Sequence, residues 1–291
     1  MKKIRAKAPA KINLTLEILD KLPSGFHKLD TVMLKLNNFC DDIEIIFDEK
    51  STEIAIESSD KSIPADEKNI CHQAAESFFK KNKKRVGLKI ILTKNIPHGA
   101  GLGGGSSDAA TTLLLLNEYF NKPFSRNQLA KMSHPIGKDI AFFFSQKNAA
   151  FMTGLCEIKK EEFNFKNPHI LIINPLEKIS TKIAFENLPE NIWFMKNKDR
   201  VSMSSRMIRA MKKNDVALVA ENMFNDFEIV IEKKYPIIKE LKQSLKAFGA
   251  SGSLMSGSGS TVFGIFQSDK DLKKAKEILK KQYPNFIISK G

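Results

Sequence analysis

Apolar and polar residues alternate near the start of the chain. Every even-numbered position from 12 to 18 holds Ile or Leu, while positions 11, 13, 15 and 17 hold Lys, Asn, Thr and Glu. This period of two predicts a half-buried strand with its apolar face in the core. Lys11 and Asn13 then share the polar face, and the pattern alone makes Lys11 an ordinary exposed lysine.

Similar patterns predict the other elements. Strands are expected at residues 30–36, 43–47, 53–57, 88–93, 149–153, 169–173, 261–266 and 286–289. Helices are expected at residues 66–80, 126–132, 181–186, 202–212, 215–224, 236–248 and 269–282, with a helical turn at 140–144. Ser125 and Asp139 stand where N-caps of two of these helices belong, and Thr181 is a candidate N-cap of a third. We place an approximate domain boundary between residues 153 and 162, after the strand that closes the first half of the chain.

The charge is unusually basic for an otherwise ordinary composition. The 291 residues carry a formal net charge of +14, with 42% hydrophobic and 27% charged residues. Such a charge is compatible with binding to a nucleic acid, with binding to an anionic small substrate, or simply with a lysine-rich surface. Aromatic residues are not interleaved with the basic ones, as a binder of single strands requires. We therefore interpret the charge as a general attraction for anions.

The cysteines and histidines indicate the redox state of the cellular compartment and whether the protein makes a metal site. The three cysteines are scattered without a CxxC pair, and the five histidines show no ligand spacing. This predicts a reducing compartment without disulfides and no metal site made by the protein. The chain has neither the apolar core of a signal peptide nor an apolar run long enough to span a membrane. We expect a cytoplasmic protein.

The segment from Pro97 to Asp108 is rich in glycine and stands between a predicted strand and a predicted helix. Five of its twelve residues are Gly. Bare peptide N–H groups beside a helix N-terminus favour a polyanion, here a nucleotide phosphate. We expect Ser106 and Ser107 to cap the helix. The candidate phosphate-binding residues are Pro97, His98, Gly99, Ala100, Gly101, Leu102, Gly103, Gly104, Gly105, Ser106 and Ser107.

Other interpretations of this glycine loop fit less well. A mobile Gly/Ser linker seldom stands between a strand and an apolar helix. A Walker A loop needs a Lys after its last Gly, where this chain has Ser106. The spacing of Gly99, Gly101 and Gly104 satisfies GxGxxG, but no acidic residue follows at the distance that a dinucleotide fold requires.

Five separated segments resemble the GHMP kinases, and two of them resemble the 4-diphosphocytidyl-2-C-methyl-D-erythritol kinase family in particular. The five, in family order, are residues 9–14 (PAKINL), 25–33 (GFHKLDTVM), 97–107, 136–143 (IGKDIAFF) and 255–263 (MSGSGSTVF). The resemblance implies an α/β fold (strictly α+β) with two domains. Residues 1–155 form a ribosomal-S5-like ATP-binding domain, residues 156–291 form the C-terminal domain, and the active site lies in the cleft between them.

The resemblance also implies the chemistry. Members phosphorylate the 2-hydroxyl of 4-diphosphocytidyl-2-C-methyl-D-erythritol with ATP, in the non-mevalonate isoprenoid pathway. Lys11 and Asp139 match the catalytic pair, with Asp139 accepting the hydroxyl proton. The glycine loop matches the site of the ATP phosphates, with Mg²⁺ accompanying the nucleotide, and Asn69 matches an Asn near the adenine.

Four residues match positions of the substrate site: Asn13, Phe26, His27 and Thr181. Phe26 replaces the usual Tyr, which keeps a ring to stack on cytosine but removes a hydroxyl. Lys138 and Cys156 replace an Ala and a Gly of the family pattern. The second Gly/Ser segment, residues 249–260, is expected to close over the transferred phosphate or the substrate.

Three alternatives stay open from the sequence. The first is a related GHMP kinase acting on homoserine or mevalonate, and the second is a non-catalytic nucleotide-binding sensor. The third is a basic nucleic-acid module, which predicts steeply salt-dependent binding to duplex DNA. We expect a small-molecule substrate and ATP as partners, and neither nucleic acid nor membrane; the sequence leaves the oligomeric state open.

Overall fold

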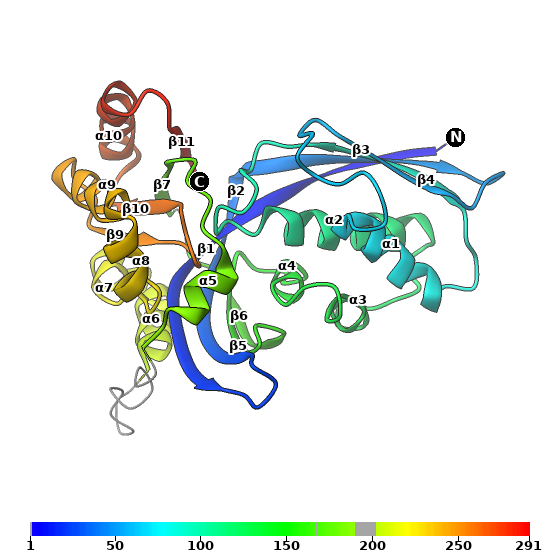
Figure 1. Ribbon diagram of the computed structural model, residues 1–291, viewed down its shortest axis with the longest axis horizontal. Coiled ribbons are helices and arrows are strands. Elements are labelled where there is room, and N and C mark those ends of the chain that lie inside the picture. The colour runs from blue at the N-terminus through cyan, green and yellow to red at the C-terminus, as the bar shows by residue number, and fades with distance from the viewer. Residues whose placement is uncertain (1, 167, 190–201) are drawn as a thin grey trace. The chain divides into compact units, whose positions relative to one another are not determined.

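The computed structural model describes residues 2–166, 168–189 and 202–291 (Figure 1). Its contacts divide the chain into two compact units, neither of them continuous in sequence. Unit 1 comprises residues 1–10, 39–98 and 103–145, and unit 2 comprises residues 11–38, 99–102 and 146–291. Two long strands, β1 (Lys2–Lys21) and β2 (His27–Asp48), contribute residues to both units. The division into domains at residue 155 stays a prediction.

In unit 1, helices pack against one face of a group of paired strands. β4 (Gly87–Thr93) pairs antiparallel with the end of β2, from Asp42 to Asp48, and parallel with β3 (Ile54–Ser58). Two helices, α1 (Ile70–Lys81) and α2 (Gly104–Tyr119), pack against each other on one face of these strands (Figure 1). The shorter α3 (Arg126–Ser133) and α4 (Ile140–Phe143) follow.

Unit 2 contains two groups of paired strands. β5 (Ala149–Gly154) pairs antiparallel with β2 and with β6 (Ile158–Phe163), and β8 (Phe224–Asn225) pairs with β1 at Thr15 and Leu16. A separate antiparallel sheet has the order β11-β7-β10-β9. Its strands are β7 (His169–Asn174), β9 (Gly252–Met255), β10 (Val262–Phe266) and β11 (Ile287–Lys290).

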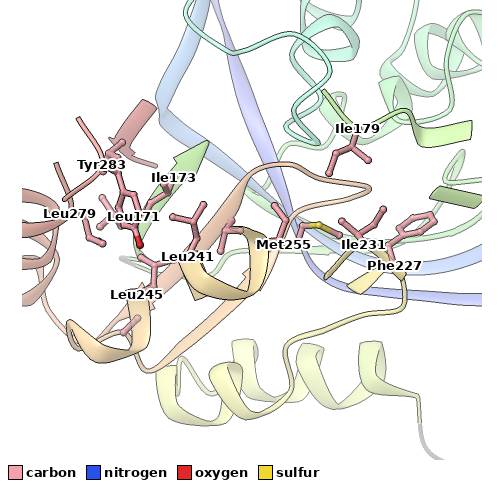
Figure 2. Close-up of a cluster of buried hydrophobic side chains, with 14 of the residues drawn as sticks. Leu171, Ile173, Ile179, Phe227, Ile231, Leu241, Leu245, Met255, Leu279 and Tyr283 are labelled. Atoms are coloured by element: carbon pink, nitrogen blue, oxygen red, sulfur yellow. The ribbon is translucent and has the colours of Figure 1, made fainter. Parts of the chain in front are cut away.

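The helices of unit 2 cover this sheet with apolar stripes. In α9 (Pro236–Ala247) the buried residues are Ile238, Leu241 and Leu245, the spacing of a single helix face. α10 (Asp269–Gln282) buries an equivalent stripe. Both stripes meet the sheet residues in one apolar core, which Figure 2 shows around Leu171 and Met255. The other helices are α5 (Thr181–Glu186), α6 (Met203–Lys212), α7 (Val216–Glu221) and α8 (Glu228–Lys234).

The polar face of β1 departs from the sequence prediction. Lys11 is 3% exposed and Asn13 is 1% exposed, so the strand is buried on both faces and the half-buried prediction was wrong. The sequence could not reveal the segments that cover this face, because they come from distant parts of the chain. The separate strands predicted at residues 30–36 and 43–47 are one strand, β2, and the sequence analysis missed β6, β8 and α8.

Candidate functional site

The glycine loop runs directly into α2, but the serines do not cap that helix. The N-cap is Gly103, which has the left-handed backbone conformation (φ 66°) and no side chain to offer. Ser106 and Ser107 lie inside the first turn, so the predicted capping was wrong. Because a helix leaves its first N–H groups without partners in the helix, Gly104, Gly105 and Ser106 present backbone donors to an incoming anion.

The middle of the glycine loop is held by two other motifs of unit 2. Leu102 O accepts a hydrogen bond from Lys11 N (2.9 Å), and Ala100 O accepts one from Thr261 N (3.3 Å). Ser256 Oγ donates to Gly101 O (2.9 Å) and accepts from Asn13 N (3.3 Å). A Cβ at Gly101 would lie 2.1 Å from Ser256 O, so only glycine fits here. The three motifs recognised in the sequence around residues 11, 101 and 256 therefore lie together.

Lys11 is held by a hydrogen-bonded side chain on its own strand. Its Nζ donates to Asn13 Oδ1 at 2.6 Å. Asn13 Nδ2 in turn donates to Thr31 Oγ1 on β2 at 2.9 Å. Both members of the first pair are buried, so the position of the Lys11 ammonium is fixed by neutral neighbours as well as by the strand.

Asp139 occupies the N-cap position of α4, yet its side chain makes no cap hydrogen bond. The carboxylate is therefore not used in the way that the cap interpretation predicted. Asp139 belongs to unit 1 and Lys11 to unit 2. Their action as a catalytic pair stays a prediction.

A buried ionic cluster in unit 1 was missed by the sequence analysis. Lys94 Nζ lies between the carboxylates of Asp41 and Asp108 and forms an ion pair with each. Asp41 Oδ1 also accepts from the backbone N–H groups of Asn95 (2.6 Å) and Ile96 (2.8 Å), just before the glycine loop. Asp108 belongs to the second turn of α2, so the cluster ties the segment before the loop to the helix after it.

The same cluster explains why residue 104 is a glycine and why the pKa of Asp108 is raised. A Cβ at Gly104 would lie 3.0 Å from Ile96 Cγ2 and 3.4 Å from Asp41 Oδ2. Burial raises the pKa of Asp108 to about 7, although the neighbouring Lys94 ammonium acts to lower it. The pKa of Lys94 is raised by its two carboxylate partners, which outweigh its burial. Lys94 thus carries a proton that it does not readily release.

Asn69 is the N-cap of α1. Its Oδ1 accepts from Cys71 N (2.8 Å) and its Nδ2 donates to Pro64 O (2.7 Å). With 2% of its surface exposed, its side chain is engaged within unit 1. The predicted contact with adenine is untested.

The two aromatic residues expected to bind the substrate, Phe26 and His27, have different surroundings. His27 stacks on Phe185 with ring centroids 4.7 Å apart, and its pKa is lowered by burial and by Lys21. Phe26 is 56% exposed. The neutral His27 ring thus lies against an apolar partner, whereas the neighbouring phenyl ring points to solvent.

Thr181 is not the N-cap of α5, as one interpretation of the sequence had it. The cap is Ser180, whose side chain accepts from Ile183 N. The Thr181 hydroxyl instead lies 2.9 Å from Ser258 Oγ, in the second Gly/Ser loop. Both residues belong to unit 2, where this contact brings a predicted substrate residue to that loop.

Comparisons with known proteins fit this geometry. Residues 69–147 match the sequence model of the GHMP kinases N terminal domain, and residues 207–285 match that of the GHMP kinases C terminal. The 4-diphosphocytidyl-2-C-methyl-D-erythritol kinase of Desulfotalea psychrophila is 38% identical over 96% of this chain and 90% of its own length. That of Citrifermentans bemidjiense is 36% identical over 94% of each.

The chain belongs to the 4-diphosphocytidyl-2-C-methyl-D-erythritol kinase family.

Solved structures agree with this assignment. A 4-(cytidine 5'-diphospho)-2C-methyl-D-erythritol kinase aligns with a TM-score of 0.79 and 25% identity over 99% of this chain and 98% of its own. A homoserine kinase from Cytophaga hutchinsonii, at 18% identity and a TM-score of 0.76 over 100% of this chain and 94% of its own, shares the fold. The predicted family and its α/β GHMP kinase fold are confirmed.

Two structural searches bear on partners. Within the described residues, no helix is long and apolar enough to cross a membrane. Across the same residues, no three His, Cys, Asp or Glu side chains form a group that could hold a metal ion.

Proposed function

We propose that this protein transfers the γ-phosphoryl group of ATP to the 2-hydroxyl of 4-diphosphocytidyl-2-C-methyl-D-erythritol, a step of non-mevalonate isoprenoid synthesis. The observation that carries the proposal is family membership at 34–38% identity over nearly the whole chain. The local geometry supports it, because glycines lead directly into the N-terminus of α2, and within unit 2 the middle of the glycine loop is hydrogen-bonded to the strand that carries Lys11.

The ATP phosphates bind at the glycine loop. The backbone N–H groups at the start of α2 and the positive end of its dipole attract the phosphate oxygens. Glycine suits this task because a Cβ at Gly105 would have its nearest neighbour at 3.7 Å and one at Gly99 would meet nothing within 4 Å, which leaves room for a ligand. The backbone carries the binding, so a Walker-type lysine is not needed.

Lys11 and Asp139 act on the acceptor hydroxyl. Phosphoryl transfer depends mainly on positioning and on charge stabilisation. Asp139 is the general base that accepts the hydroxyl proton, a contribution of about 10²–10⁴-fold in rate. Lys11 stabilises the negative charge on the transferring phosphoryl group.

Mg²⁺ accompanies ATP in this proposal. When bound, it neutralises charge on the phosphates during transfer. Magnesium sites in kinases take few protein carboxylates and draw the remaining ligands from water and substrate phosphates. This fits the described part of the chain, which offers no all-protein metal cage. Ser107, the last residue of the glycine-loop motif, has a buried Oγ without a hydrogen-bond partner among the described residues and is an oxygen ligand of the right kind.

The cytidine end of the substrate binds unit 2. His27, stacked on Phe185, and the exposed ring of Phe26 provide flat surfaces for the base. Thr181 and Asn13 provide polar groups for the remainder of the substrate. The proposal places the reaction in the cytoplasm and includes neither a nucleic acid nor a membrane as partner.

A substrate panel tests the proposal. The purified protein is given ATP and Mg²⁺ with 4-diphosphocytidyl-2-C-methyl-D-erythritol, homoserine or mevalonate, and ADP release is followed. We expect ADP only with the cytidyl compound. Turnover of homoserine or mevalonate without turnover of the cytidyl compound would reassign the substrate. Nucleotide binding without turnover of any acceptor would make the protein a sensor.

A further inference from the structure

We propose that Thr31 is a positioning residue for phosphoryl transfer: it fixes the orientation of the Asn13 amide and, through it, the position of the Lys11 ammonium. The inference rests on the proposed function, in which Lys11 acts on the reacting groups. All the contacts that carry it lie within unit 2.

The direction of the hydrogen bonds follows from the Thr31 hydroxyl. This hydroxyl donates to the backbone carbonyl of Thr15 at 2.6 Å. A carbonyl can only accept, and a hydroxyl has a single proton to give. The Thr31 oxygen is therefore left with acceptor capacity alone, and its remaining neighbour, Asn13, must donate to it.

The Asn13 amide can then take only one orientation. Its NH₂ group faces Thr31 Oγ1 at 2.9 Å, and its carbonyl oxygen faces Lys11 Nζ at 2.6 Å. In the flipped orientation the amide would present a donor to the ammonium and an acceptor to a hydroxyl whose proton is already used. Two buried hydrogen bonds would be lost, and each would leave a buried polar group unsatisfied.

The surroundings of Thr31 hold this arrangement in place. Thr31 is fully buried, and the next residue, Val32, donates from its backbone N–H to Thr15 Oγ1 at 2.9 Å. The Thr15 hydroxyl continues to Ser204 Oγ at 2.9 Å, at the start of α6. A Cβ at Gly257 would lie 3.5 Å from Asn13 Oδ1, so the second Gly/Ser loop passes close to the amide. The orientation of the amide is therefore set by its two hydrogen-bond partners, Thr31 and Lys11.

The arrangement gives Asn13 a task besides contact with the substrate. Because its two polar ends are engaged by Thr31 and Lys11, its side chain transmits the orientation set on β2 to the reacting residue on β1. A displacement of about 1 Å in a reacting group can lower a rate by about 10²-fold. The hydroxyl of Thr31 thus affects the rate without touching the substrate.

The test uses a matched pair of variants, Thr31→Val and Thr31→Ser. The first keeps the shape of the side chain and removes the hydroxyl, while the second keeps the hydroxyl and removes a methyl group. We expect Thr31→Val to lower kcat by about 10- to 100-fold with KM for ATP within about twofold of wild type. Thr31→Ser should retain kcat within about threefold.

A double-mutant cycle separates positioning from a general structural effect. In a Lys11→Met background there is no ammonium to position, so we expect Thr31→Val to have no further effect on kcat. The same fold loss in both backgrounds, or an undiminished kcat for folded Thr31→Val, would overturn the proposal. If Thr31→Val does not fold, Thr31→Ala, which also removes the hydroxyl, replaces it in the same cycle with the same expected non-additivity.

The controls keep this result apart from the proposed function. A wild-type protein without turnover of the cytidyl compound would refute the function itself, before any variant is compared. Full activity of Lys11→Met would refute the role of Lys11 and, with it, the positioning by Thr31. Only when wild type is active and Lys11→Met is impaired does the cycle report on Thr31, where loss of the Thr31→Val effect supports the proposal.

Discussion

The two units each bury a polar cluster, but they do so with different chemistry. In unit 1 the cluster is ionic: Lys94 lies between Asp41 and Asp108. In unit 2 a chain of amide and hydroxyl groups leads through Asn13 and Thr31 to the Lys11 ammonium. The first cluster joins the two ends of the glycine loop, and the second leads to a predicted catalytic residue.

The difference shows that a fold can use one kind of interaction to hold segments together and another to orient a single side chain. Charges in a low-dielectric interior interact strongly, so the ionic cluster tolerates no missing partner and responds to pH. Neutral hydrogen bonds contribute less each but have fixed donor and acceptor ends, which makes them suited to orienting one side chain. We therefore expect the ionic cluster to determine stability and the neutral chain to determine rate.

Loss of the lysine from the ionic cluster should have the largest effect on stability. Lys94→Met leaves two buried carboxylates without their cation. Breaking a buried ion pair by removing one partner costs about 3–5 kcal/mol. This lowers the Tm by about 10 °C or more, as measured by thermal unfolding followed by circular dichroism.

The matched control is Lys89→Met, on the exposed face of β4. Lys89 pairs with Glu57 at 2.7 Å, but both side chains are at least half exposed. Such surface pairs contribute at most about 1 kcal/mol. Equal Tm losses in the two variants would show that the Lys94 cluster does not hold unit 1 together.

A smaller difference in stability is expected between the alanine variants of Gly101 and Gly99, which both lie in the part of the glycine loop that belongs to unit 2. Both have positive φ, 76° and 69°, so Ala strains the backbone at either position. Only Gly101→Ala also places a Cβ against Ser256 O. We expect Gly101→Ala to be less stable than Gly99→Ala by about 1–3 kcal/mol, which thermal melts of the two variants measure. Indistinguishable melting temperatures would mean that the contact between the two loops is not rigid.

The pH dependence of stability should also distinguish the two clusters. An unfolded Asp titrates near pH 3.9, whereas burial raises the pKa of Asp108 to about 7. Between these values the folded chain binds a proton that the unfolded chain has released, so stability falls as pH rises from about 4 to 7. Asp108→Asn cannot titrate. The stability change is about 3 kcal/mol, so the Tm of this variant relative to wild type should rise by about 6–12 °C between pH 4.5 and 7.5.

Asp269→Asn serves as the control for this titration. Hydrogen bonds from Lys273 and Lys290 lower the pKa of Asp269 to about 2, so its contribution to stability changes only below pH 4. Its Tm relative to wild type should stay constant from pH 4.5 to 7.5. Parallel curves for Asp108→Asn and wild type over this range would contradict the assignment of the titration to Asp108.

The sequence predicted the elements whose signals are local. The ends of α5 and α10, the cap of α3 at Ser125 and the strand before the glycine loop agree with the structure, because periodicity and capping residues act within a few positions. The two-residue strand β8 was missed because it is too short for a periodic signal.

Contacts between distant residues were beyond the sequence. Ser256 and Gly101 are hydrogen-bonded across 155 positions, and no local pattern reports such a pair. Lys94 looks like an ordinary charge between a strand and a loop, although its side chain is 6% exposed. Five motifs indicated the family from the sequence, whereas the hydrogen-bond directions around Thr31 required the fold. The motifs are residues 9–14, 25–33, 97–107, 136–143 and 255–263.

The central claim is that Asp139 accepts the proton of the attacking hydroxyl, and the most direct test is the turnover of Asp139→Asn. The measurement is steady-state ADP release with 4-diphosphocytidyl-2-C-methyl-D-erythritol as acceptor, together with the Kd for ATP. We predict a kcat at least about 10²-fold below wild type with an unchanged Kd for ATP. Turnover equal to that of wild type would contradict the account.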